Sequence, residues 1–177
     1  MRKLKTSELN RLTKDQFKSS EKFPVIIVLD NIRSMHNVGS VFRTCDAFRI
    51  EALYLCGITA KPPHREIQRT ALDATETVDW TYFENTIDAV LKLKSDGYSI
   101  YGIELVDKSI LLSDFFPENN IKIALILGNE IEGVSEEIID KLDACIEIPQ
   151  FGMKHSLNVS VSAGIVIWDI INKIKLF

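Results

Sequence analysis

The sequence predicts a single α/β domain with a mainly parallel sheet and helices on both faces. Residues 24–29 and 121–127 are continuous apolar runs, as expected of strands that are buried on both faces. Such runs alternate along the chain with segments of helical periodicity, which favours a parallel sheet. The 177 residues allow one well-packed domain but not two ordinary ones.

The first half of the chain predicts a βαβ unit. A strand at 24–29 is followed by a polar stretch, 30–39, and then by a helix whose apolar positions are Val41, Phe42, Cys45 and Phe48. A second strand at 52–56 ends at Gly57. Residues 58–70 are expected to form one long irregular connection, in which Pro62 and Pro63 block a helix until about His64.

The second half repeats the alternation. We expect a helix around 89–93 that ends near Gly97, and strands at 99–103, 121–127 and 145–148. Ser135 can cap a short helix whose first turn carries Glu136 and Glu137. The last helix, 158–174, is apolar on most of its circumference, so it must be buried inside the domain or against a second subunit.

Several classes of protein are disfavoured. The N-terminus has no apolar signal core, and the most apolar stretch, 157–171, is too short and too polar to span a membrane. The three cysteines form no Cys-x-x-Cys pair, so we expect buried thiols in a reducing cytoplasm: Cys45, Cys56 and Cys145. His155 has no second His or Cys at ligand spacing, and no metal is expected.

Charge is distributed unevenly. Residues 1–22 hold seven Lys or Arg against three acidic residues; because the whole chain carries −4, the remainder carries −8. We therefore divide the chain into a basic N-terminal arm, 1–22, and a domain, 23–177. The arm can contact phosphates, although a solvated surface helix explains the same charges.

Three polar segments follow predicted strand ends, where ligands bind in open α/β sheets. In the first, Asn37 is expected in the loop and Arg43 about one turn into the helix, both facing the same strand end. The second, 128–133, has two glycines but neither a Walker A Lys-Ser/Thr pair nor a Rossmann glycine pattern. The third, 148–160, places a glycine loop before Ser156 and Asn158, and Ser156 would also suit a helix N-cap.

Together these segments resemble the SpoU branch of the SPOUT RNA methyltransferases. The matching motifs are Asn-x-Gly-x-x-x-Arg-Thr at 37–44, Leu-Gly-Asn-Glu-x-x-Gly-Val-Ser at 127–135 and Ile-Pro-Gln-Phe-Gly-x-x-x-Ser-Leu-Asn-Val-Ser-Val at 148–161. The resemblance implies a C-terminal trefoil knot, a homodimer packed through the last helix, and S-adenosylmethionine as cofactor. The implied reaction is methyl transfer to a ribose 2′-hydroxyl of tRNA or rRNA in the cytoplasm.

The resemblance also implies which residues act. It assigns the ribose and its phosphate to Arg43, Asn37, Glu130, Ser156 and Asn158. It assigns the cofactor to Ile103, Glu104, Leu105, Gly128, Ile148, Ser156 and Leu157. A guanidinium is always charged, so we interpret Arg43 as a phosphate anchor and alkoxide stabiliser and leave the general base open.

The resemblance implies that larger members carry a separate N-terminal RNA-binding domain, and we expect this chain to have only the basic arm in its place. We expect RNA to be held instead by the arm and the 58–70 segment, through Arg2, Lys3, Lys5, Arg11, Arg65 and Arg69. An alternative is a catalytically silent module that binds cofactor and RNA and acts in RNA assembly. A flavodoxin-like or receiver-type domain also fits the alternation, but it has no use for the third motif.

Overall fold

The computed structural model describes residues 1–5, 8–118 and 121–175. Within this range the chain forms one seven-stranded sheet, in which every strand pair is parallel and the order is β3-β2-β1-β6-β4-β7-β5. The strands are β1 Phe23–Asp30, β2 Ile50–Cys56, β3 Asp79–Phe83, β4 Tyr98–Ile103, β5 Ile110–Leu111, β6 Lys122–Leu127 and β7 Ala144–Glu147.

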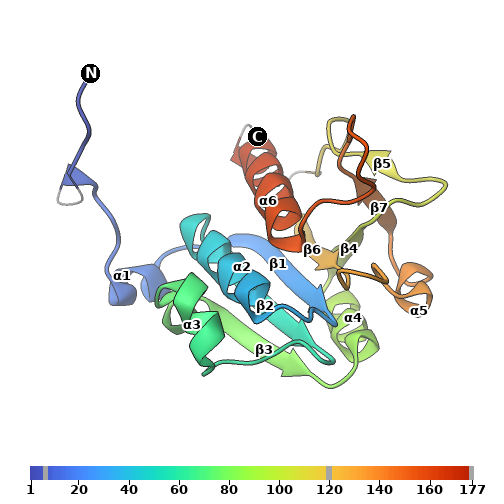
Figure 1. Cartoon of the computed structure of the whole chain (residues 1–177), viewed down its shortest axis with the longest axis horizontal. Coiled ribbons are helices and arrows are strands. Elements are labelled where there is room, and N and C mark those ends of the chain that lie inside the picture. The colour runs from blue at the N-terminus through green and yellow to red at the C-terminus, as the bar shows by residue number, and fades with distance from the viewer. Residues whose placement is uncertain (6–7, 119–120, 176–177) are drawn as a thin grey trace.

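Helices cover both faces of this sheet (Figure 1). One face carries α1 Lys14–Ser19, α2 Met35–Ala47, α3 Arg65–Ala71, the 3₁₀ turn Ala74–Glu76 and α6 Val159–Lys175. The other carries α4 Thr86–Ser95 and α5 Glu136–Ile139. The predicted α/β class with a parallel sheet and helices on both faces is confirmed.

The burial of the central strands explains why they appear in the sequence as continuous apolar runs. Val25 to Leu29 of β1 and Ile123 to Leu127 of β6 are all buried, and the two strands pair in register from Val25↔Ile123 to Leu29↔Leu127. Each strand faces helices on both sides, so neither has a solvent face to show alternation. Cys45, Cys56 and Cys145 are free and buried, as expected.

Three stretches differ from the expectation. Residues 65–70 form most of α3 instead of continuing the irregular connection, although the helix does start directly after His64. The sheet also gains β3 and the two-residue β5, which were not predicted. Both are edge strands with exposed or half-buried residues, so their sequences lack the apolar runs that mark the central strands.

The C-terminal helix α6 has two kinds of surface. Ala163, Val166, Ile167, Ile170 and Ile171 are buried in the core. Val161, Ile165 and Trp168, spaced along one side of the helix, expose 50%, 37% and 58% of their surface. The helix was expected to be buried inside the domain or against a second subunit, and the domain itself buries one side of it. No helix in the described part of the chain is long and apolar enough to cross a membrane.

Candidate functional site

A pocket of about 690 Å³ opens at the carboxyl ends of β6, β4 and β7, three adjacent strands. Its wall is made by the three segments that follow those strands: 103–105, 127–133 and 146–159 with gaps. Parallel strands bring such segments to one edge of the sheet although they are far apart in the sequence. The volume lies within the range of small-molecule sites.

Every residue that the sequence assigned to the cofactor lines this pocket. The set is Ile103, Glu104, Leu105, Gly128, Ile148, Ser156 and Leu157. Half-buried Ile103 and Ile148 and exposed Leu105 and Leu157 offer apolar surface beside polar backbone. This mixture fits an amphipathic molecule such as S-adenosylmethionine, which combines a nucleoside with a charged amino acid.

The glycine loop after β6 is closed by close backbone packing. A Cβ on Gly128 would lie 2.1 Å from the Gly133 carbonyl carbon and 2.2 Å from the Val134 nitrogen. Gly133 itself has φ +70°, a conformation that L side chains rarely adopt. Asn129 and Gly133 exchange two backbone hydrogen bonds of 2.9 Å. Both glycines are therefore needed for the shape of the pocket wall.

Glu104 braces this loop from the neighbouring strand. Its carboxylate accepts the Val134 N–H at 3.0 Å and the Leu105 N–H at 3.0 Å. Glu104 thus lines the pocket while both of its oxygens are engaged with backbone donors. Its contacts in this structure fix the wall of the pocket, and a Cβ on Gly133 would collide with its Oε2 at 2.2 Å.

At the edge of the pocket a chain of hydrogen bonds joins the three sequence motifs, 37–44, 127–135 and 148–161. The Asn37 amide donates to Glu130 Oε1 at 3.0 Å, and the Asn158 amide donates to Asn37 Oδ1 at 3.1 Å. Asn158 Oδ1 in turn accepts the N–H and the hydroxyl of Ser160. The fold therefore brings together Asn37, Glu130 and Asn158, three of the five residues assigned to the substrate.

Asn37 is not in a loop, contrary to the sequence-based expectation. It lies in the first turn of α2, which begins at Met35 and is capped by the Ser34 hydroxyl on the Asn37 N–H. Residues 30–34 are mostly polar, and the first turn of the helix has no apolar periodicity. The sequence pattern therefore did not indicate where the helix begins. Asn37 is buried, with 9% of its surface exposed, so its amide needs the partners it has.

Glu130 anchors the start of α2 as well as Asn37. Its carboxylate accepts the Arg33 N–H at 3.0 Å and the Ser34 N–H at 3.1 Å. Partial burial alone would raise the pKa of Glu130, but the hydrogen bonds from Arg33, Asn37 and Ser34 together lower it below its ordinary value. The carboxylate is ionised, and its oxygens are occupied by donors.

Arg43 and Ser156 are placed differently from these three. Arg43 is exposed on α2 and does not line the pocket; six residues turn a helix through about 600°, so its side chain leaves on another side from Asn37. Within one chain, the side chains of Asn37 and Arg43 therefore do not face the same strand end, and that expectation is wrong. Ser156 lines the pocket and is exposed, and the helix-capping position belongs to Asn158 instead.

Ser135 also differs in detail. It occupies the N-cap position of α5, with Glu136 and Glu137 in the first turn as expected, but its side chain makes no capping hydrogen bond. Its carbonyl accepts the Ile138 and Ile139 N–H groups, so the backbone alone starts the helix. Side chains that the sequence did not single out also line the pocket, among them Gln150 and Lys154.

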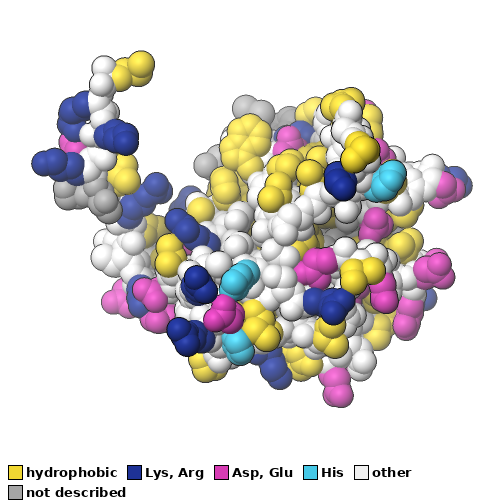
Figure 2. All heavy atoms as spheres, viewed as in Figure 1, with side chains coloured by type: hydrophobic (Ala, Val, Ile, Leu, Met, Phe, Trp, Pro, Cys, Tyr) yellow, Lys and Arg dark blue, Asp and Glu magenta, His cyan; other side chains and the backbone are white. Residues whose placement is uncertain are grey.

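The residues expected to bind RNA are exposed. Figure 2 shows Lys and Arg side chains gathered along the N-terminal segment, and Lys3, Lys5 and Arg11 belong to it. Arg2 pairs with Glu8 at 2.5 Å, which lowers the pKa of Glu8. Arg65 and Arg69 lie on α3, beside α2. Among the described residues, no group of three His, Cys, Asp or Glu side chains could hold a metal ion.

Comparison with known proteins agrees with this geometry. Residues 24–168 match the model of the SpoU rRNA Methylase family. The chain is 32% identical over 148 residues to the tRNA (guanosine(18)-2′-O)-methyltransferase of Aquifex aeolicus, covering 82% of this chain and 67% of that enzyme.

Solved structures show the same fold. The TrmH/SpoU tRNA modifying enzyme of A. aeolicus superimposes with a TM-score of 0.80 at 28% identity, over 92% of this chain and 81% of that one. An AdoMet-bound rRNA methyltransferase from Sinorhizobium meliloti gives a TM-score of 0.77 at 24% identity, over 88% and 58% of the two chains. Two of its motifs line one pocket, the first is joined to them there through Asn37, and the family model covers most of its length, so the chain belongs to the SpoU rRNA methylase family.

Proposed function

We propose that this chain is an S-adenosylmethionine-dependent RNA methyltransferase that transfers a methyl group to a ribose 2′-hydroxyl of tRNA or rRNA. The observation that carries the proposal is the hydrogen-bonded chain Glu130–Asn37–Asn158 at the rim of the pocket. The three residues come from three separate motifs, and a retired site would have no need to keep them joined. Family membership and the relative that methylates a tRNA guanosine support the same reaction.

In this proposal the pocket holds the cofactor, through the seven residues that the sequence assigned to it. When bound, S-adenosylmethionine supplies an electrophilic methyl group. The chain's own part is to align the ribose oxygen with that methyl and to exclude water, which accounts for much of the rate in such transfers. The braced glycine loop and Glu104 serve this purpose by keeping the pocket wall rigid.

Asn37, Asn158 and Ser156 are proposed to contact the ribose and its phosphate. Arg43 does not line this pocket within one chain, so its proposed role as phosphate anchor and stabiliser of the developing alkoxide rests on the family resemblance alone. Glu130 already accepts three hydrogen bonds, so we assign it to orient Asn37 and not to remove the proton. The RNA itself is proposed to be held by the basic residues of the arm and of α3.

We further propose that the active form is a homodimer in the cytoplasm. The solvent-facing side of α6 supports a dimer, because Val161, Ile165 and Trp168 form an apolar stripe on an otherwise packed helix. Three free, buried thiols support a reducing compartment. The C-terminal trefoil knot implied by the family, the division at residue 22 and the absence of a metal stay predictions.

The test has two steps. Calorimetric titration with S-adenosylmethionine is expected to show binding, and tritiated methyl transfer to total tRNA or rRNA is expected to follow. Arg43→Ala should abolish most transfer and leave cofactor affinity intact, whereas Lys94→Ala, an exposed cation on the opposite face of the sheet, should change neither. Mass-spectrometric mapping of RNA from a strain without the gene then identifies the nucleotide.

Two outcomes would count against the proposal. If the cofactor binds but no RNA class is methylated, the chain is a binding module of the same fold. If Arg43→Ala transfers methyl groups at the unmodified rate, the role assigned to Arg43 is wrong.

A further inference from the structure

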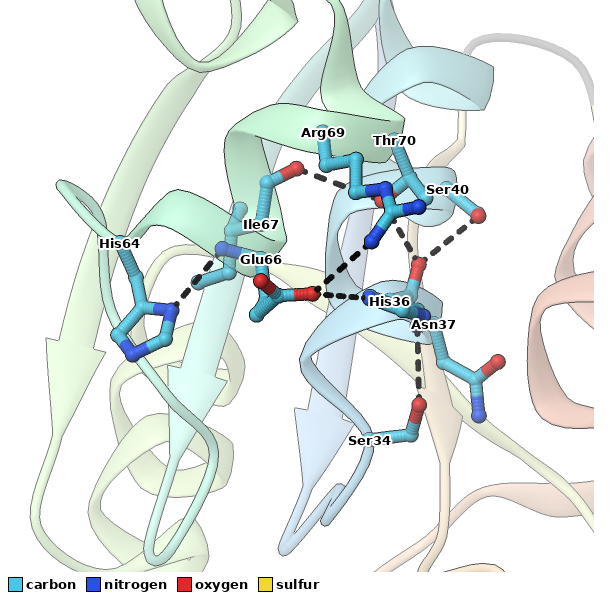
Figure 3. A network of polar contacts seen from close by, with 9 residues as sticks. All are labelled: Ser34, His36, Asn37, Ser40, His64, Glu66, Ile67, Arg69 and Thr70. Carbon is cyan, nitrogen blue, oxygen red and sulfur yellow. Dashed lines mark hydrogen bonds and ion pairs between the residues drawn. The ribbon is translucent and has the colours of Figure 1, made fainter.

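His36 directly precedes Asn37 in the first turn of α2, and its side chain points to α3 (Figure 3). Its Nε2 lies 2.6 Å from Glu66 Oε2, to which it donates. The His36 carbonyl accepts the Thr70 hydroxyl at 3.0 Å and the Ser40 hydroxyl at 2.8 Å. The residue beside Asn37 is thus tied to α3 through both its side chain and its backbone.

The two helices also pack closely at Gly39, one residue after the first turn of α2. A Cβ on Gly39 would lie 2.2 Å from Thr70 Oγ1 and 2.3 Å from the Ile67 carbonyl oxygen. The α2 backbone at Gly39 therefore packs directly against the backbone of Ile67 and the hydroxyl of Thr70, both in α3. The first turn of α2 has a fixed distance to α3, and the His36–Glu66 pair sets its rotation.

Glu66 is itself held in place. Its N–H is capped by the His64 imidazole at 3.2 Å, and Arg69 lies 3.8 Å from the carboxylate (Figure 3). The hydrogen bond from His36 is the largest cause that lowers the pKa of Glu66 below its ordinary value; desolvation opposes it and the charge of Arg69 adds to it. The carboxylate stays ionised and presents a fixed acceptor to His36.

We propose that His36 and Glu66 are positioning residues, which hold the first turn of α2 so that Asn37 keeps its geometry toward Glu130 and Asn158. Asn37 is fixed from the pocket side by two hydrogen bonds, and the pair fixes it from the outer side. The inference rests on the proposed function, because it matters only if Asn37 acts in methyl transfer. Small displacements of a reacting group can cost about a hundredfold in rate.

The test compares His36→Ala, Glu66→Ala and the double variant with a matched surface pair. Lys92 on α4 and Asp96 just after it form an exposed ion pair of 2.9 Å, and neither lines the pocket, so Lys92→Ala, Asp96→Ala and their double variant are the controls. We expect each His36 or Glu66 variant to lower kcat about tenfold. The affinity of these variants for S-adenosylmethionine and their melting temperatures should match those of the control variants.

Two readouts separate positioning from general structural damage. The side-chain amide resonances of Asn37 should shift in the His36→Ala and Glu66→Ala proteins and stay in place in the α4 variants. The double variant should be no slower than either single one, since both remove the same contact. Glu66→Gln, which retains an oxygen acceptor, should restore most of kcat.

Unchanged kcat and unchanged Asn37 resonances in the His36 and Glu66 variants would overturn the inference. Asn37→Ala is measured alongside them. If Asn37→Ala loses transfer while the other variants do not, the proposed function stands and the positioning role fails. If Asn37→Ala methylates normally, the assignment of Asn37 to the substrate fails instead.

Discussion

Glu130 lies far from α2 in the sequence, yet its two carboxylate oxygens receive the donors that start this helix. Replacing it with glutamine places an NH₂ group where acceptors are needed. We expect Glu130→Gln to slow methyl transfer about tenfold, because Asn37 loses its partner, and to lower the free energy of unfolding by about 1 kcal/mol. Radiometric assay and urea unfolding measure the two effects.

The matched control for this change is Glu137→Gln, which removes an exposed carboxylate from the first turn of α5. It should leave both transfer and stability close to those of the unmodified protein. Equal effects of the two substitutions would show that the contacts of Glu130 contribute no more to methyl transfer or stability than an exposed carboxylate does.

The lowered pKa of Glu130 also predicts a pH dependence of stability. A carboxylate whose pKa is lower in the folded state stabilises the protein above its ordinary value, here 4.5, and this contribution disappears as the pH falls through the lowered value. The unmodified protein should therefore be more stable than Glu130→Gln by the full amount at pH 7, and this difference in the free energy of unfolding should shrink toward zero at strongly acidic pH. Urea unfolding across this range, at one protein concentration, tests the sign. A gap that widens in acid contradicts it.

At the scale of elements, the contact between α2 and α3 decides where the substrate residues sit. Gly39→Ala would push a methyl group against Thr70 Oγ1 and the Ile67 carbonyl. We expect a loss of about 1–3 kcal/mol in the free energy of unfolding, since backbone must move to admit it. Gly152→Ala, where nothing lies within 4 Å of the added Cβ, is the control and should be neutral in thermal unfolding.

The same contact between α2 and α3 also predicts an effect of Gly39→Ala on methyl transfer. Because the displaced turn carries Asn37, methyl transfer should fall further than the loss of stability alone explains. A folded variant with full activity would show that the contact between α2 and α3 serves only stability.

At the scale of the whole molecule, the exposed side of α6 predicts assembly. Trp168→Glu replaces the largest side chain of the apolar stripe with a charge, and we expect it to convert a dimer to a monomer in light scattering after gel filtration. Leu91→Glu is the matched control: it changes an apolar helix residue of similar exposure, 54%, on the other face of the sheet. An unmodified protein that is monomeric at micromolar concentration would contradict the proposed dimer.

The charge distribution gives a prediction on the same scale. Removing residues 1–12 deletes Arg2, Lys3, Lys5 and Arg11 but keeps the Thr13 capping box of α1 and the buried Phe17. RNA affinity should fall and its dependence on salt should become shallower, because fewer phosphates are neutralised. Affinity for S-adenosylmethionine should not change. An unaltered salt slope would place RNA binding elsewhere.

The sequence by itself determined the α/β class, the central strands and the polar segments after strand ends, two of which, 128–133 and 148–160, line the pocket. A strand buried on both faces must be apolar throughout, so β1 and β6 are visible without a structure. Parallel strands place their ends at one edge, which brings these segments together, whereas Ile103, Glu104 and Leu105 were assigned by the family resemblance. The edge strands β3 and β5 have no such constraint and were missed.

Only the tertiary structure decided how the site residues meet. Asn37 and Glu130 are separated by 93 positions, and Asn37 and Asn158 by 121, so no local pattern records their hydrogen bonds. The His36–Glu66 pair spans 30 positions and two helices, one of which was expected to be a loop. Local sequence specifies whether a residue is buried or turns the chain, whereas the packing of helices on the sheet specifies which polar groups satisfy one another.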